Sequence, residues 1–123
     1  MEPSKKILVV EDEHPLRKAL VDKLTREGFM VIEAKNGAEG LAQIATHEPD
    51  LILSDIIMPV MDGVTMLNQY RNDSALRQVP VIALTNLNSI ENVADVVSNG
   101  ANSFLTKSNW KIADVVENVK ANL

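Results

Sequence analysis

The chain has 123 residues, the size of one domain, and is long enough to bury an apolar core without disulfides or structural metals. Its formal net charge of −5 at pH 7 argues against direct nucleic-acid binding, which depends on clustered Lys and Arg. The chain contains no cysteine, which excludes thiolate metal sites, and only 3% of its residues are aromatic, which leaves few rings to stack on bases or flavins.

The ends of the chain carry no targeting or linker pattern. Polar residues 2–6 lead directly into the first apolar run, and no apolar stretch has the length of a membrane span. No linker or low-complexity tract follows the last helical pattern. We therefore expect a cytoplasmic protein without membrane insertion, made of a single domain over residues 1–123 with no output domain.

Apolar runs of strand length alternate along the chain with stretches of helical period, which is typical of a parallel sheet with helices on both faces. After the first run at residues 7–10, Pro15 suits the first turn of a helix and Gly28 suits its C-terminus. Residues 29–34 predict the second strand, and Asn36-Gly37 a turn. The next helix ends before Pro49, and its predicted buried stripe is Ala38, Leu41, Ala42 and Ala45.

The second half of the chain repeats the alternation. Residues 51–53 predict the third strand, residues 64–71 a helix, and Pro80 the start of the fourth strand. A helix at residues 90–97, closed by Asn99-Gly100, precedes the fifth strand at residues 104–106. The last helix has its apolar positions at Ile112, Val115, Val116 and Val119. The sequence thus predicts an α/β fold with five strands and five helices.

Four of the predicted strands stop on residues that phosphoryl transfer requires. The first ends on Glu11-Asp12, the third on Asp55, the fourth on Thr85 and the fifth on Lys107. The carboxyl ends of parallel strands share one edge of a sheet, where open α/β sheets bind their ligands. We therefore expect these side chains to meet in one crevice.

Three carboxylates in one crevice repel one another unless a cation lies among them. Magnesium suits acids without His or Cys, because it prefers oxygen ligands and binds through one or two carboxylates, waters and a phosphate oxygen. We expect Mg²⁺ at Asp12 and Asp55, with Glu11 holding a metal-bound water and the backbone carbonyl of Ile57 as a further ligand.

An ionised aspartate is able to act as a nucleophile toward phosphorus, and Asp55 is the candidate acceptor. Phosphoryl transfer needs little beyond positioning and charge stabilisation on the transferring oxygens. Lys107 offers an ammonium group and Thr85 a hydroxyl group for two of these oxygens.

These segments resemble the receiver domain of two-component response regulators, in the CheY-like superfamily. The resemblance covers nearly the whole chain and rests on four motifs in order, at residues 9–13, 49–63, 79–85 and 100–107. It implies a flavodoxin-like, doubly wound sheet of strand order 2-1-3-4-5.

The resemblance also implies a function. Asp55 would take a phosphoryl group from a sensor histidine kinase or a phosphotransfer protein, in a phosphorelay that involves Mg²⁺. The domain would catalyse only its own phosphorylation and dephosphorylation, so it would not be an enzyme in the usual sense. Thr85 and Lys107 would sense the phosphoryl group, and Phe104 would turn inward as the switch. A downstream protein would read residues 90–99, the strand of Phe104 and the last helix.

Three residues depart from the family pattern. Ser108 follows Lys107 where proline is usual, so we expect a trans peptide or a strained loop there, and Ser108 or Asn109 as the cap of the last helix. Asn86 replaces the usual small residue after Thr85. Phe104 replaces the frequent tyrosine, which predicts an inward ring before phosphorylation and a weak switch.

Other functions fit the sequence less well or remain open. A flavodoxin needs a phosphate-cradling loop where residues 11–13 are acidic, and an aspartyl phosphatase usually has a second acid where Ile57 stands. The alternative that stays open is a non-cycling receiver that serves as a protein-interaction module, because Asn86 and Ser108 could impair the chemistry while preserving the fold.

Overall fold

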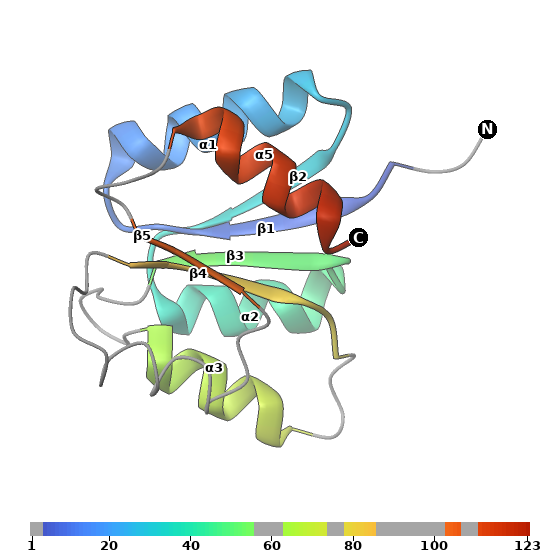
Figure 1. Ribbon diagram of the computed structural model, residues 1–123. Helices are drawn as coiled ribbons and strands as arrows, with labels where there is room; N and C mark the ends of the chain where they lie inside the picture. Colours follow the sequence, from blue (N-terminus) through green and yellow to red (C-terminus); the bar gives the residue numbers. More distant parts are fainter. Residues whose placement is uncertain (1–3, 56–62, 74–77, 86–102, 107–110) are drawn as a thin grey trace.

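The computed structural model describes residues 4–55, 63–73, 78–85, 103–106 and 111–123, and of residues 63, 64, 85 and 103–106 it describes the backbone only. Five strands form one parallel sheet in the order β2-β1-β3-β4-β5 (Figure 1). The strands are β1 (Lys6–Val10), β2 (Met30–Ala34), β3 (Leu51–Asp55), β4 (Val81–Thr85) and β5 (Ser103–Thr106). The predicted doubly wound sheet and its strand order are confirmed.

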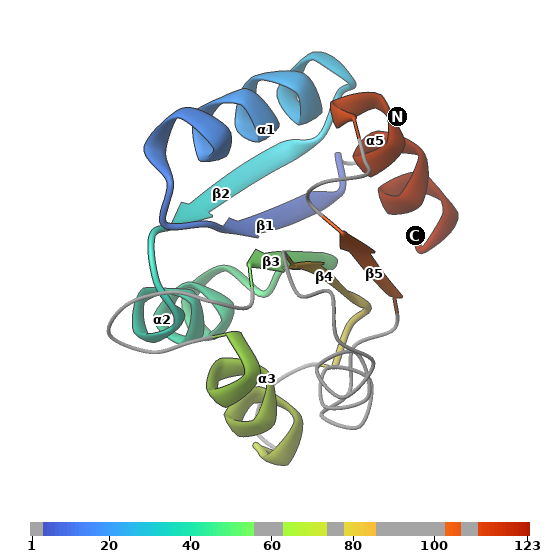
Figure 2. The ribbon, with the colours of Figure 1, turned by 60° about the vertical axis from the view of Figure 1, so that its left-hand side comes forward.

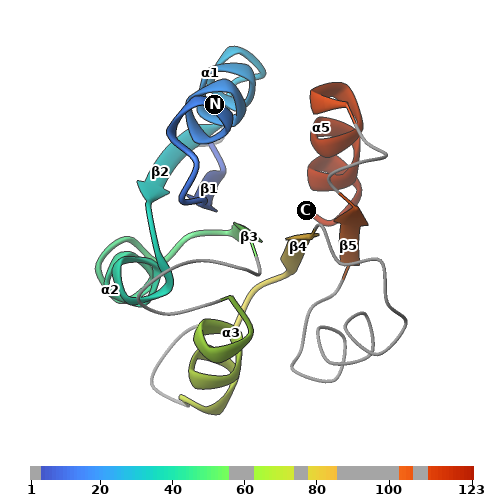
Figure 3. The same cartoon turned by 90° about the vertical axis from the view of Figure 1, so that its left-hand side faces the viewer.

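Helices cover both faces of this sheet. The described helices are α1 (His14–Arg26), α2 (Gly37–His47), α3 (Gly63–Asn72) and α5 (Ile112–Ala121). Helices α1 and α5 lie on one face, and α2 and α3 lie on the other (Figures 2 and 3). The predicted helix over residues 90–97 and its Asn99-Gly100 end lie outside the described residues. Among the helices that are described, none has both the length and the apolar character needed to cross a membrane.

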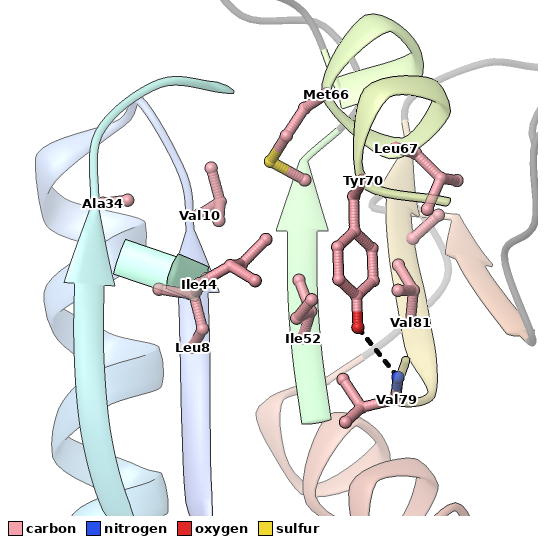
Figure 4. Packing of buried hydrophobic residues seen from close by; sticks show 11 residues of the cluster. Leu8, Val10, Ala34, Ile44, Ile52, Met66, Leu67, Tyr70, Val79 and Val81 are labelled. Atoms are coloured by element: carbon pink, nitrogen blue, oxygen red, sulfur yellow. Dashed lines mark hydrogen bonds between the residues drawn. The ribbon is translucent and has the colours of Figure 1, made fainter. Parts of the chain in front are cut away.

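The core consists of two apolar clusters, one on each side of the sheet. Successive side chains of a strand point to opposite faces, so in β1 Ile7 and Val9 pack toward α1 and α5, whereas Leu8 and Val10 pack toward α2 and α3 (Figure 4). Because both faces are covered, the central strands β1, β3 and β4 consist largely of continuous apolar runs instead of alternating apolar and polar residues. Strands β1, β3 and β4, which lead to Glu11, Asp55 and Thr85, are therefore fixed by a buried core on either side.

The ends of α1 follow the sequence prediction. Pro15 lies in the first turn, where its missing N–H has no helical partner to lose. Gly28 follows the C-terminus with a φ of 95°, a left-handed conformation that a side chain would strain. This sharp end returns the chain directly to β2, whose first residue pairs with Lys6 of β1.

The prediction for α2 was wrong in two respects. Asn36 forms the N-cap of the helix instead of a free turn, and its side chain accepts a hydrogen bond of 2.8 Å from the backbone N–H of Glu39. The predicted stripe of alanines is also rotated, because Ala38, Ala42 and Ala45 are exposed. The buried residues are instead Gly37, Gly40 and Ile44, with Leu41 partly buried.

The reason for the rotation is the close approach of α2 to its neighbours. A Cβ atom at Gly40 would lie 2.8 Å from Met66 Sδ and 3.2 Å from Val10 Cγ2. The missing side chain of Gly40 allows this approach, so the packed face combines two glycines with Leu41 and Ile44 instead of the predicted alanines.

The start of α5 also differs from the prediction. The N-cap is Lys111, not Ser108 or Asn109. Asp114, in the first turn, accepts a hydrogen bond of 2.8 Å from the backbone N–H of Lys111. The carboxylate in the first turn also interacts favourably with the helix dipole. The apolar positions of this helix are confirmed, since Val115, Val116 and Val119 are buried.

Candidate functional site

The sheet register brings two of the acidic segments side by side. Val10 of β1 pairs with Ser54 of β3, so the next residues, Glu11 and Asp55, lie at the same level of two adjacent strands. In the order β2-β1-β3-β4, the chain continues from β1 to β2 toward one edge of the sheet and from β3 to β4 toward the opposite edge. This is the switch point at which open α/β sheets bind ligands.

Glu11, Asp12 and Asp55 form what we call the acidic cluster. One carboxylate oxygen from each residue lies within 4.8 Å of those of the other two. Glu11 is fully buried and Asp55 is 4% exposed, whereas Asp12 is more open to solvent. Buried like charges at this separation are costly unless they are compensated. The arrangement is therefore a candidate cation site.

Backbone hydrogen bonds hold Glu11 in place. Its N–H donates to the carbonyl oxygen of Ala34 in β2 at 3.0 Å. Its carboxylate oxygen Oε2 accepts from the backbone N–H of Asp12, also at 3.0 Å. The orientation of the Glu11 carboxylate is thus coupled to the peptide that leads into Asp12.

A buried hydroxyl group holds the backbone of Asp55 in place. Ser54 Oγ donates to the carbonyl oxygen of Asp55 at 2.9 Å, and Ser54 is only 1% exposed. Because a buried carbonyl without a partner costs free energy, this bond stabilises the end of β3.

Arg17 was not identified from the sequence. Its Nη1 donates to the carbonyl oxygen of Glu11 at 2.8 Å, and its Nε lies 3.2 Å from Glu33 Oε1 in an ion pair. The only signal in the sequence is an arginine in the first turns of the helix that follows the acidic pair, which by itself predicts a solvated charge.

The acidic cluster fits magnesium by its chemistry. All three donors are carboxylate oxygens, which suit a hard divalent cation better than a transition metal. Octahedral coordination at about 2.0–2.1 Å places ligand oxygens about 3–4 Å apart. The observed spacing of up to 4.8 Å therefore needs only a small side-chain rotation or a bridging water.

The other predicted site residues are described in part or not at all. Thr85 ends β4 and pairs with Thr106 of β5, and Phe104 pairs with Ala83. For Thr85 and Phe104 the structure describes the backbone but not the side chain. Ile57, Lys107, Asn86 and Ser108 lie outside the described residues. The roles given to all site residues stay predictions.

The fold and the acidic cluster together define a doubly wound α/β domain with a candidate divalent-cation site at its switch point. Residues 7–120 match the family model of the response regulator receiver domain, and the chain belongs to this family.

Individual relatives agree with this assignment. The chain is 38% identical over 104 residues to the response regulator PleD of Caulobacter vibrioides, covering 85% of this chain and 23% of PleD. It is 36% identical over 103 residues to the chemotaxis protein CheY of Bacillus subtilis, covering 83% of this chain and 84% of CheY. The structure of the chemotaxis protein CheY4 of Vibrio cholerae superposes with a TM-score of 0.90 at 28% identity, covering 98% of this chain and 100% of that chain.

The chain therefore spans about a quarter of PleD but most of CheY, with 23% and 84% of their lengths covered. What it shares with both proteins is the receiver domain.

Proposed function

We propose that this receiver domain is a phosphoacceptor of a two-component system, with Asp55 as the acceptor and Mg²⁺ as its cofactor. The observation that carries the proposal is the acidic cluster, in which Asp55 lies beside two further carboxylates at the sheet's switch point. A lone buried acid is a poor phosphoacceptor without a nearby cation, whereas three carboxylate ligands make a site for one.

In the proposed reaction a carboxylate oxygen of Asp55 attacks phosphorus. The bond between phosphorus and the donor breaks, and its electron pair leaves with the donor. When the donor is a phosphohistidine, this is a P–N bond. Magnesium, when bound, supplies positive charge next to the transferring oxygens. Asp12 and Asp55 would hold the cation, Glu11 would hold one of its bound waters, and Lys107 and Thr85 are proposed to contact the remaining oxygens. Ile57 is proposed to add its backbone carbonyl to the metal ligands.

The proposed output is a change of conformation that a partner protein reads. We propose Phe104 as the aromatic switch, and the surface around residues 90–99, β5 and α5 as the place where a downstream protein binds. A sensor histidine kinase or a phosphotransfer protein is the proposed donor. The chain would then act only on its own aspartate, in the cytoplasm, as a single receiver domain and not as an enzyme with a turning-over substrate.

The test is phosphorylation by a small-molecule donor. The protein is incubated with Mg²⁺ and acetyl phosphate and weighed by mass spectrometry, together with Asp55→Asn and, as a matched control, Asp22→Asn on the exposed face of α1. We expect one labile phosphate on the unaltered protein and on Asp22→Asn, and none on Asp55→Asn.

The opposite result would support the alternative function. If no adduct forms while a control receiver is labelled, the chain is better described as a non-cycling interaction module, as the departures at Asn86 and Ser108 would allow.

A further inference from the structure

We infer that Arg17 is a positioning residue for the cation site, and that it acts by fixing the Glu11 carbonyl from outside the acidic cluster. The inference rests on the proposed function, since it concerns how tightly the site holds Mg²⁺. Arg17 itself donates hydrogen bonds and has no acceptor to offer a metal.

The geometry gives Arg17 two anchors. Its Nη1 donates to the backbone carbonyl oxygen of Glu11 at 2.8 Å, and its Nε pairs with Glu33 Oε1 at 3.2 Å. The Arg17 side chain is only 14% exposed, so its planar guanidinium is held between β2 and the end of β1. A lysine, with its compact ammonium, would not reproduce this fork.

The contact matters because of where the Glu11 carbonyl lies. This carbonyl belongs to the peptide that joins Glu11 to Asp12, and the N–H of the same peptide donates to the Glu11 carboxylate at 3.0 Å. On the other side of Glu11, its own N–H donates a hydrogen bond of 3.0 Å to the carbonyl oxygen of Ala34. Fixing this one peptide plane therefore orients the Glu11 carboxylate and places the backbone from which the Asp12 side chain starts.

Positioning and charge make opposite predictions for Arg17. If only charge matters, removing a cation near an acidic site should strengthen Mg²⁺ binding, because the repulsion between two positive charges is lost. If positioning matters, the same change should weaken binding, because the carboxylates lose their alignment. Partners behind metal ligands typically contribute about 10–100-fold in metal affinity.

The experiment measures the dissociation constant of Mg²⁺ by calorimetry, without any phosphodonor, for the parent, Arg17→Met, Arg17→Lys and Lys18→Met. Lys18 is the matched control, since it is the next residue in α1, is exposed, and carries the same charge. We expect Arg17→Met to weaken binding about 10-fold or more, Arg17→Lys to recover part of this loss, and Lys18→Met to bind as tightly as the parent or slightly more tightly.

Thermal unfolding without Mg²⁺ separates positioning from a general structural role. A lower unfolding midpoint of Arg17→Met together with an unchanged dissociation constant would overturn the inference, and so would tighter binding that matches Lys18→Met. If Arg17→Met does not fold, Arg17→Lys tests the inference instead. The inference requires that Arg17→Lys also binds Mg²⁺ more weakly than the parent. A parent protein that does not bind Mg²⁺ would instead overturn the proposed function itself.

Discussion

Among single residues, Tyr70 illustrates how a side chain supplies the acceptor for a buried backbone N–H. Tyr70 is fully buried in the cluster beneath α3, and its hydroxyl oxygen accepts a hydrogen bond of 2.8 Å from the backbone N–H of Val79 (Figure 4). This bond ties α3 to the segment that leads into β4. A buried N–H that loses its acceptor costs far more than an exposed one.

Tyr70→Phe should therefore lower the free energy of unfolding by about 1–3 kcal/mol, as measured by urea denaturation. Thr46→Val is the control, because the hydroxyl of Thr46 also forms a hydrogen bond with the backbone, donating to the carbonyl oxygen of Ala42, but on the exposed side of α2. Its effect should stay within about 0.5 kcal/mol. Equal stabilities of Tyr70→Phe and the parent would show that the Val79 N–H finds another acceptor.

At the scale of the elements, the packing of α2 on the sheet depends on the absence of a side chain. Alanine is favoured over glycine inside a helix by about 1 kcal/mol. At position 40, however, the new Cβ would lie 2.8 Å from Met66 Sδ, within a fully buried side chain. We expect Gly40→Ala to destabilise the protein by about 1–2 kcal/mol despite the better helix former.

Adding Met66→Ala should make room for the new methyl group. Chemical denaturation of the parent, both single variants and the double variant should then show that the two losses are less than additive. A gain in stability for Gly40→Ala alone, as helix propensity would give, would contradict the packing in the structure.

Helices α1 and α5 are joined by an exposed cluster of charges. Glu27, which caps the end of α1, lies 3.2 Å from Lys120 of α5 and 3.4 Å from Lys23. The hydrogen bond and charge of Lys120, and then those of Lys23, lower the pKa of Glu27 below its ordinary value. A lowered pKa in the folded state means that the contact stabilises the protein above the ordinary pKa and that this contribution disappears as the pH falls through the lowered value.

Glu27→Gln should accordingly be slightly less stable than the parent at neutral pH and low salt, and equally stable once the pH is low enough to protonate Glu27. Thermal unfolding between neutral and acidic pH measures this convergence, and added salt should reduce the neutral-pH difference because the pair is exposed. Glu117→Gln, at an exposed position of α5, is the matched control variant. A difference for Glu27→Gln that stays constant with pH would contradict the assignment.

For the whole molecule, the sequence was sufficient to predict the sheet because the central strands β1, β3 and β4 are buried on both faces. Apolar runs such as residues 7–10 and 51–53 allow few other structures, and Pro15 and Gly28 mark the ends of α1 directly. The acidic cluster was predictable for a related reason, since its acids follow strand ends that a parallel sheet must bring to one edge.

The buried face of α2 and the contacts of Arg17 could not be predicted, because both depend on neighbours that are distant in the sequence. Nothing near Gly40 indicates that Met66 and Val10 will approach it, so alanines seemed the better buried stripe. Arg17 likewise looks like a surface charge until β2 brings Glu33 beside it. Local patterns predict elements, whereas contacts between elements decide which face packs and which charge orients a site.

In the proposed function, Glu11, Asp12 and Asp55 act as one cation site that supports a phosphoacceptor. The most direct measurement is thermal unfolding of the parent and of Asp12→Asn over a titration with Mg²⁺. Without Mg²⁺, Asp12→Asn should be the more stable protein, because the repulsion between like charges within 4.8 Å is reduced. With Mg²⁺ in excess, the parent should gain stability as a bound ligand requires, by about 2.7 kcal/mol at 100 times the dissociation constant. The variant should gain much less. An unfolding midpoint of the parent that does not respond to Mg²⁺, or an equal response of Asp12→Asn, would contradict the claim.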